Sequence, residues 1–288
     1  MQSAQPGRNP EASGQRPYRG LRDATYADYR PDATLAADGM KLQPSRNLCP
    51  PVERNIPLQD GVAAAAASGE ARQCAQRRAD MVELQLKRRG ICDPRVLEAM
   101  GSTPREEFVP ETCRHAAYRD EPLPIGEGQT ISQPFMVAAM AEAAELRETE
   151  RVLEVGAGCG YQAAILSRLA REVVAVECIT ALADGARERL ARLGFANVRV
   201  QRGDGSGGWP AEAPYDAIVV SAAAPQVPRP LVEQLTAGGR LVIPVGESQS
   251  QELVRIRKRA DGSTWQQTLH YCRYVPLVGE WGWGGTRR

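Results

Sequence analysis

Hydrophobic positions in the second half of the chain alternate between short strand-like runs and longer helical stretches. Five short, mostly apolar and often β-branched runs follow Arg151, as expected for strands covered on both faces. These predicted strands are Val152–Val155, Val173–Val176, Val198–Gln201, Ala217–Val220 and Leu241–Val245. The predicted helices between them are Tyr161–Ala170, Leu182–Leu193 and Pro230–Leu235. This alternation predicts an α/β fold with a doubly wound, mainly parallel sheet.

The end of the chain departs from this alternation. Glu252–Arg259 and Thr264–Tyr274 are strand-like, and they flank Asp261-Gly262, a dipeptide favoured in hairpin turns. We therefore expect a C-terminal antiparallel hairpin added to the edge of the sheet.

Helical patterns precede the predicted sheet. A helical period begins at Met81, and a second helix is expected to start at Asp93-Pro94, because aspartate caps helices and proline suits their first turn. Phe135–Leu146 is also predicted to be helical. Prolines and glycines interrupt Tyr118–Pro134, so this segment is predicted to be a loop.

Residues 1–75 differ in composition from the rest of the chain. They are rich in Pro, Gly, Ser, Arg and Ala, and their apolar residues show neither helical nor strand periodicity. We predict a disordered N-terminal extension at 1–75 and a single domain at 76–288. The pattern assigns no role to the extension, and a translation start at Met81 would also explain it.

Composition and charge mainly exclude classes of partner and of site. The formal net charge is +1, so we expect no broad binding of nucleic acid or of an acidic membrane. None of the seven cysteines forms a C-x-x-C pair, so neither a metal site nor a disulfide framework is predicted. No segment resembles a signal peptide or a membrane span, and we expect a monomeric, cytoplasmic protein.

The strongest local signal for a ligand is the run VLEVGAGCGY that starts at Val152. A predicted strand leads into Gly156, Gly158 and Gly160, and a predicted helix follows. Glycine permits the tight turn and lets backbone N–H groups approach a ligand. Glu177 ends the next predicted strand, where an acid can accept hydrogen bonds from ribose hydroxyls.

The spacing of the glycines favours one class of cofactor. A dinucleotide site has the pattern G-x-G-x-x-G, whereas the third glycine comes one residue early in this chain. Glu154, just before the loop, is a poor neighbour for phosphate but a good one for an ammonium group. S-adenosylmethionine carries an ammonium and no phosphate, so the pattern favours it over a nicotinamide cofactor. A glycine-rich turn that binds nothing remains the alternative.

Asp204 and Gly205 follow the third predicted strand and would lie at the same edge of the sheet. Ligands of doubly wound folds bind at this edge. Asp204 is therefore either a residue that holds the adenine amino group or part of an ordinary Asp-Gly turn.

With these motifs in place, the chain resembles the protein-L-isoaspartate O-methyltransferase family from about Met81 to Gly279. The most specific stretch is DEPLPIGEGQTISQP at Asp120–Pro134, which is not a generic methyltransferase feature. Further matching stretches, in the family's order, are VLEVGAGCGYQAA at Val152–Ala164, GDGSGGWP at Gly203–Pro210, YDAIVVSAAAP at Tyr215–Pro225, GGRLVIPVG at Gly238–Gly246 and RYVPLVG at Arg273–Gly279.

This resemblance implies a Rossmann-like methyltransferase that uses S-adenosylmethionine and acts on isoaspartyl-containing proteins and peptides. The methyl ester would cyclise to a succinimide and hydrolyse partly to normal aspartate. The implied catalytic residue is Ser132. The implied substrate-binding residues are Thr130, Ile131 and Gln133, together with Val275, Pro276 and Leu277. Two departures from the family are apparent: Cys159 replaces its usual Ser or Thr, and the N-terminal extension and the tail Glu280–Arg288, with Trp281 and Trp283, are atypical and have no assigned role.

The chemistry of such a reaction needs no general base. A carboxylate acceptor with a reference pKa of roughly 3.9 is already ionised at neutral pH. The only histidines, His115 and His270, are accordingly given no catalytic role. The Ser132 hydroxyl is expected to donate to one carboxylate oxygen and orient the other. On spacing alone, Ser132 could instead cap the helix that follows it.

Two further functions stay open at this point. One is a methyltransferase directed to normal aspartate in a specific partner protein. The other is a non-catalytic adaptor that keeps the cofactor pocket and binds peptides in the groove. Labelled-methyl transfer to isoaspartyl and aspartyl peptides separates the three possibilities.

Overall fold

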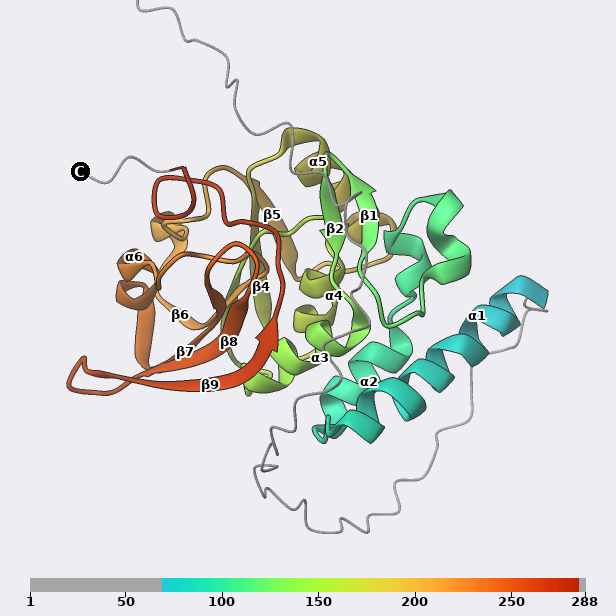
Figure 1. Cartoon of the computed structure of the whole chain (residues 1–288), viewed down its shortest axis with the longest axis horizontal. Helices are drawn as coiled ribbons and strands as arrows, with labels where there is room; N and C mark the ends of the chain where they lie inside the picture. The colour runs from blue at the N-terminus through green and yellow to red at the C-terminus, as the bar shows by residue number, and fades with distance from the viewer. Residues whose placement is uncertain (1–68, 285–288) are drawn as a thin grey trace, which may run out of the picture. The chain divides into compact units, whose positions relative to one another are not determined.

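A seven-stranded sheet forms the centre of the chain, of which the computed structural model describes residues 69–284 (Figure 1). The strand order is β5-β4-β3-β6-β7-β8-β9. In chain order, the strands are β3 (Arg151–Val155), β4 (Glu172–Glu177), β5 (Val198–Arg202), β6 (Tyr215–Val220), β7 (Leu235–Gly246), β8 (Gln251–Lys258) and β9 (Thr264–Cys272). The first five are parallel, and β8 and β9 are antiparallel additions at one edge. The predicted sheet and its C-terminal hairpin are confirmed.

Alternate residues of the central strands enter two separate hydrophobic cores. On β3, Val152 belongs to one core, whereas Leu153 and Val155 belong to the other. The same alternation holds on β6, where Val219 and Ile218 point to opposite faces. Because both faces of these strands are buried, their sequences are continuously apolar.

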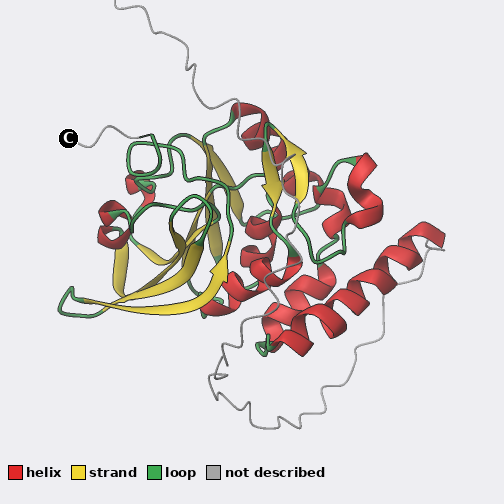
Figure 2. Cartoon of the chain, viewed as in Figure 1, coloured by secondary structure: helices red, strands yellow, loops and turns green. Residues whose placement is uncertain are grey.

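The helices cover the two faces of the sheet unequally (Figure 2). Residues of α2, α3, α4 and α5 fill one core, and α6 contributes to the other. These helices are α2 (Pro94–Ser102), α3 (Pro134–Ala143), α4 (Tyr161–Ser167), α5 (Thr180–Arg192) and α6 (Arg229–Glu233), and a short 3₁₀ helix, η6 (Pro210–Glu212), precedes β6. None of the helices in the described residues combines the length and apolar character needed to cross a membrane.

The predicted start of α2 is confirmed. The Asp93 side chain accepts a hydrogen bond from the Arg95 N–H at 2.8 Å, and Pro94 occupies the first helical position. Shorter helical turns surround α2, namely η2 (Met81–Leu86), η3 (Lys87–Arg89), η4 (Arg105–Phe108) and η5 (Glu111–Ala116).

The described structure begins earlier than the predicted domain boundary. Helix α1 (Gly69–Asp80) spans that boundary, so residues 69–75 are helical in the structure. The sequence of α1 lacks the apolar stripe that would have predicted a helix, and accordingly none of its residues is buried. The remainder of the predicted extension, residues 1–68, lies outside the described residues.

The segment Tyr118–Pro134, predicted to be a loop, contains a small hairpin instead. Strand β1 (Leu123–Gly126) pairs antiparallel with β2 (Gln129–Ile131), and Leu123 lies opposite Ile131. Both side chains are buried. The residues that look like breakers form the turn, where Gly126, Glu127 and Gly128 all have positive φ angles.

Candidate active site

The glycine loop begins where β3 ends at the carboxyl edge of the sheet. Gly156, Gly158 and Gly160 have φ angles of 85°, 54° and 88°, which other residues rarely adopt. A side chain at Gly160 would also lie 3.0 Å from the Leu190 side chain of α5. The loop passes directly into α4, and Gly156 and Gly158 are its partly exposed residues.

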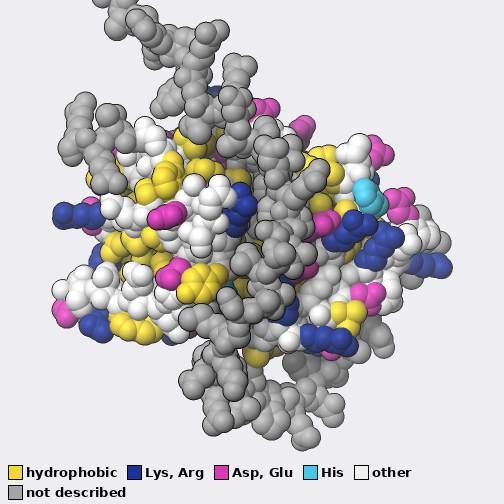
Figure 3. All heavy atoms as spheres, in the orientation of Figure 1, with side chains coloured by type: hydrophobic (Ala, Val, Ile, Leu, Met, Phe, Trp, Pro, Cys, Tyr) yellow, Lys and Arg dark blue, Asp and Glu magenta, His cyan; other side chains and the backbone are white. Residues whose placement is uncertain are grey.

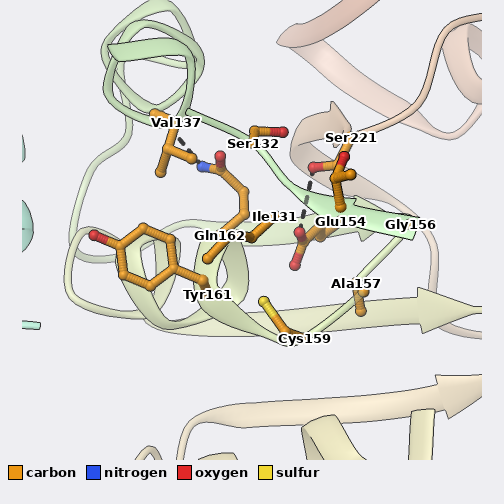
Figure 4. A pocket seen from close by; sticks show the side chains of 12 residues that line it. Ile131, Ser132, Val137, Glu154, Gly156, Ala157, Cys159, Tyr161, Gln162 and Ser221 are labelled. Atoms are coloured by element: carbon orange, nitrogen blue, oxygen red, sulfur yellow. Dashed lines mark hydrogen bonds between the residues drawn. The ribbon is translucent and has the colours of Figure 1, made fainter. Parts of the chain in front are cut away.

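A cavity separates this loop from the end of β2 (Figure 4). Six of the predicted site residues line it: Thr130, Ile131, Ser132, Glu154, Gly156 and Gly158. Residues not predicted as site residues complete the lining: Val137, Ala157, Cys159, Tyr161, Gln162 and Ser221. The segment Thr130–Pro134, here called the Ser132 segment, and the glycine loop are distinct motifs in the sequence. The structure brings both to one cavity.

Glu154 is fully buried beneath this cavity. Its Oε1 accepts a hydrogen bond from the Ser221 hydroxyl at 3.3 Å, and its Oε2 has no hydrogen-bond partner in the structure. Burial raises the pKa of Glu154 well above its ordinary value. A buried carboxylate oxygen without a donor is costly, and a ligand ammonium group would satisfy it. This geometry fits the amino group of S-adenosylmethionine.

Glu177 holds the glycine loop from the end of β4. Its Oε2 accepts a hydrogen bond from the Gly158 N–H at 2.8 Å, and its Oε1 accepts one from the Ile179 N–H at 3.0 Å. The Cys178 thiol also donates to Oε1 at 3.6 Å, so the second acceptor position of Oε2 is the one that remains for a ribose hydroxyl. Glu177 does not line the same cavity as Glu154, and neither does Gly160.

Asp204 and Gly205 follow β5 and lie outside the cavity lining. The Asp204 carboxylate accepts hydrogen bonds from the Ser206 and Glu280 N–H groups, both at 2.8 Å. A side chain at Gly205 would come within 2.9 Å of the Val155 side chain at the end of β3. Asp204 therefore contributes to a turn and also binds the C-terminal tail, a contact that the sequence did not predict.

The structure assigns the helix cap to a residue other than Ser132. Helix α3 begins at Pro134, the preceding Gln133 makes no side-chain capping bond, and the Phe135 N–H donates to Asp120 Oδ1 at 3.2 Å. Asp120 thus supplies the side-chain acceptor at this helix end. Figure 4 shows the Ser132 hydroxyl directed toward the side of the cavity where Ser221 lies.

A buried arginine, missed in the sequence, supports the Ser132 segment. Arg105 has no solvent exposure, and its guanidinium donates to the carbonyls of Ala117 and Ser132, both at 2.7 Å. It also lies 4.8 Å from the centroid of the Tyr161 ring. Burial lowers the pKa of Arg105. Its run, Thr-Pro-Arg-Glu-Glu-Phe, is polar and gave no signal of a buried role.

The predicted groove residues Val275, Pro276 and Leu277 run beside Ala223. The Ala223 N–H donates to the Val275 carbonyl, and the Leu277 N–H donates to the Ala223 carbonyl. Leu277 is buried in the core, whereas Pro276 is exposed. The Leu277 side chain therefore packs inside the protein, its N–H donates to Ala223 and its carbonyl accepts from the Trp283 N–H, so Pro276 is the exposed residue of the three.

Across residues 69–284, no group of three or more His, Cys, Asp or Glu side chains is placed to hold a metal ion. Neither histidine lines the cavity, and the His270 ring instead packs edge-on against Phe135.

Comparison with known proteins gives a consistent result. The family model described as protein-L-isoaspartate(D-aspartate) O-methyltransferase matches residues 76–282. The protein-L-isoaspartate O-methyltransferase of Methanoculleus marisnigri is 54% identical over 216 residues, which cover 75% of this chain and 98% of the relative. That of Geobacter metallireducens is 56% identical over 204 residues, which cover 71% and 94%.

Two solved structures resemble the chain over most of its described part. A protein-L-isoaspartate O-methyltransferase superposes with a TM-score of 0.65 at 31% identity, covering 71% of this chain and 67% of the other. A structure described as a protein of the same family, from Plasmodium falciparum in complex with S-adenosyl-L-homocysteine, gives 0.61 at 27% identity, covering 70% and 98%.

Proposed function

The chain belongs to the protein-L-isoaspartate O-methyltransferase family, and we propose that the cavity between its glycine loop and Ser132 is where the methyl group is transferred. The enzyme transfers a methyl group from S-adenosylmethionine to the side-chain carboxylate of L-isoaspartyl residues in proteins, and so initiates their repair. The observation that carries the site assignment is the unpartnered, buried Oε2 of Glu154 in the same cavity as Ser132.

On the cofactor side, each acidic residue has a distinct role. Glu154 binds the ammonium group, and Glu177 accepts a ribose hydroxyl while it holds the loop. The N–H groups of the loop containing Gly156, Gly158 and Gly160 approach the ligand directly. Asp204 and Gly205 form the adenine end of the site. When bound, S-adenosylmethionine supplies a methyl group made electrophilic by its positive sulfonium sulfur.

On the acceptor side, the protein supplies position. The isoaspartyl carboxylate arrives ionised, so no residue has to remove a proton. Ser132 donates a hydrogen bond to one carboxylate oxygen, which leaves the other oxygen directed at the methyl carbon. One modest bond suits this task, because several strong donors would stabilise the ground-state anion and slow its attack. Orientation of this kind lowers a barrier by roughly 7–11 kcal/mol in the best cases.

The neighbours of Ser132 hold the acceptor peptide. Thr130, Ile131 and Gln133 contact it on one side, and the segment of Val275, Pro276 and Leu277, with Pro276 exposed, forms the other side of the groove. Arg105 is a positioning residue, because it fixes the Ser132 carbonyl and does not line the cavity.

The site assignment is tested through Glu154. Calorimetry with S-adenosylhomocysteine should give tight binding to the wild-type chain and binding at least about 30-fold weaker to Glu154→Gln, because losing one partner of a buried charge pair costs roughly 2–5 kcal/mol. Glu188→Gln is the matched control, since Glu188 is exposed on α5. Equal affinity in all three proteins would place the ammonium group elsewhere.

We further propose that the protein acts as a cytoplasmic monomer without nucleic-acid or membrane partners. The near-neutral charge supports the part of this proposal that concerns nucleic-acid and membrane partners. Light scattering of the purified protein should give a mass close to 31.3 kDa, and a dimer mass would contradict it.

A further inference from the structure

The last described residues fold back onto the loop that follows β5. The segment 279–283, here called the C-terminal clasp, is the red loop that precedes the end of the chain in Figure 1. The loop it contacts contains four glycines between residues 203 and 208. Glycine loses more conformational freedom than other residues when it is ordered, so this loop needs external contacts to hold one shape.

Hydrogen bonds from the clasp backbone reach two side chains of this loop. The Glu280 N–H donates to Asp204 Oδ2 at 2.8 Å, and the Trp281 N–H donates to Ser206 Oγ at 3.0 Å. Ser206 is fully buried, and its own N–H donates to Asp204 Oδ1. The orientation of the Asp204 carboxylate is therefore set jointly by the loop and by the clasp.

Close backbone packing makes the contact specific. A side chain at Gly279 would lie 2.1 Å from Asp204 Oδ1 and 2.4 Å from Ser206 Oγ. At Gly282 it would lie 2.0 Å from the Leu277 carbonyl oxygen. The Trp281 ring covers Gly207, where an added side chain would lie 3.0 Å from it. At Gly279 and Gly282, any larger residue would force its neighbours to move, whereas at Gly207 the fit against Trp281 is tight.

The clasp also contacts the segment that follows β6, which lies next to the Glu154 end of the proposed cofactor site. The Trp283 indole N–H donates to the Ala223 carbonyl at 2.9 Å. Ala223 lies two residues beyond Ser221, whose hydroxyl donates to Glu154. The clasp thus joins the Asp204 loop to the segment that supports the ammonium end of the site.

We propose that the C-terminal clasp is a positioning element for the methyl donor, which fixes the Asp204 loop and the Ser221–Ala223 segment in the geometry that the cofactor requires. This inference rests on the proposed cofactor site. It gives a role to the atypical tryptophans of the tail, and it makes cofactor affinity depend on residues that need not touch the cofactor themselves.

The experiment compares two clasp variants with two matched controls in the full-length chain. Gly279→Ala introduces the steric clash, and Trp283→Phe removes the indole donor but keeps an aromatic ring. Gly101→Ala on α2 and Trp265→Phe on β9 make the same substitutions away from the site. The readouts are S-adenosylhomocysteine affinity by calorimetry, KM and kcat for S-adenosylmethionine, and the melting temperature without ligand.

We expect S-adenosylhomocysteine to bind about tenfold more weakly to Gly279→Ala and about threefold more weakly to Trp283→Phe. The KM for S-adenosylmethionine should rise in proportion, and kcat at saturating cofactor should stay within twofold of wild type. Both controls should match wild type. If both clasp variants melt cooperatively, and are therefore folded, but bind S-adenosylhomocysteine as tightly as wild type, the inference is wrong. If Gly279→Ala does not fold, the result for Trp283→Phe decides by itself. Failure of the wild-type chain to bind S-adenosylhomocysteine would instead contradict the proposed cofactor site.

Discussion

The glycine loop and the Ser132 segment face each other across one cavity, but different contacts hold them in place. The loop is held by backbone hydrogen bonds and by one adjacent carboxylate: the N–H groups of Gly156 and Ala157 donate to the Val176 carbonyl, and that of Gly158 donates to Glu177. The Ser132 segment is held by the backbone pairing of β2 with β1 and by two side chains from outside it: Arg105 donates to the Ser132 carbonyl, and Asp120 accepts from the Phe135 N–H.

This difference means that donor binding and acceptor positioning can be disrupted separately. Contacts of the glycine loop should control cofactor affinity, because they shape the surface that the donor contacts. Contacts of the Ser132 segment should control turnover, because they orient the acceptor carboxylate only once the donor is in place. Figure 3 shows Lys/Arg and Asp/Glu side chains interspersed on the visible face.

The largest expected effect separates the two sides most clearly. Ser132→Ala should lower kcat by about 100-fold, in line with the loss of one positioned hydrogen-bond donor. S-adenosylhomocysteine affinity should stay within twofold, because the proposed role of the hydroxyl is to orient the acceptor. Steady-state kinetics and calorimetry measure the two quantities, and wild-type turnover in this variant would show that the hydroxyl has no role in transfer.

Arg105 tests whether the acceptor side depends on remote support. Arg105→Lys keeps a charge but cannot span both the Ala117 and Ser132 carbonyls, so kcat should fall by about 10- to 30-fold. Cofactor affinity should change little. Arg114→Lys, at an exposed position, is the control. A folded Arg105→Lys protein with unchanged kcat would contradict this positioning role.

A substitution of Glu177 tests the donor side, where cofactor affinity should fall and turnover should change little. Glu177→Ala should weaken S-adenosylhomocysteine binding by about tenfold, since it removes acceptors for the ribose and for the Gly158 N–H. At saturating cofactor, kcat should remain within about threefold of wild type. If calorimetry finds no loss of affinity, the ribose assignment is wrong.

The smallest expected effect is a pH dependence of the ligand-free fold. Burial raises the pKa of Glu154, so its contribution to stability is fully present below its unfolded pKa of roughly 4.3 and is lost as the pH rises through the folded pKa. Glu154→Gln cannot ionise and should melt about 2–4 °C higher than wild type at pH 8. The gap should narrow toward pH 5 in scanning calorimetry. A gap that does not change with pH would argue against a buried charge.

Features with local sequence signals were predicted well. The parallel strands, the C-terminal hairpin and the glycine loop each follow from residues that are close together in the chain, such as the apolar run before Gly156. The hairpin β1–β2 was missed because its proline and glycines, which look like breakers, belong to the strands and their turn.

Features that depend on distant packing were not predicted. Arg105 lies 27 residues before Ser132, in a polar run that looks exposed, yet it is fully buried. Ser221 follows β6, and nothing in the sequence indicated that its hydroxyl lies beside Glu154. The link between Asp204 and Glu280 spans 76 residues. Ser132 itself was identified through family resemblance and not through its spacing.

One measurement tests the central claim, that geometry directs methyl transfer to a carboxylate that is already ionised. The full-length chain is incubated with labelled S-adenosylmethionine and with peptides of one sequence that carry isoaspartate, aspartate or alanine at a single position. We predict base-labile label on the isoaspartyl peptide alone, at a rate that, with saturating donor, stays flat between about pH 6 and pH 8, since no general base titrates in the transfer step. Equal labelling of the aspartyl peptide, or no labelling by protein that binds the donor, would contradict it.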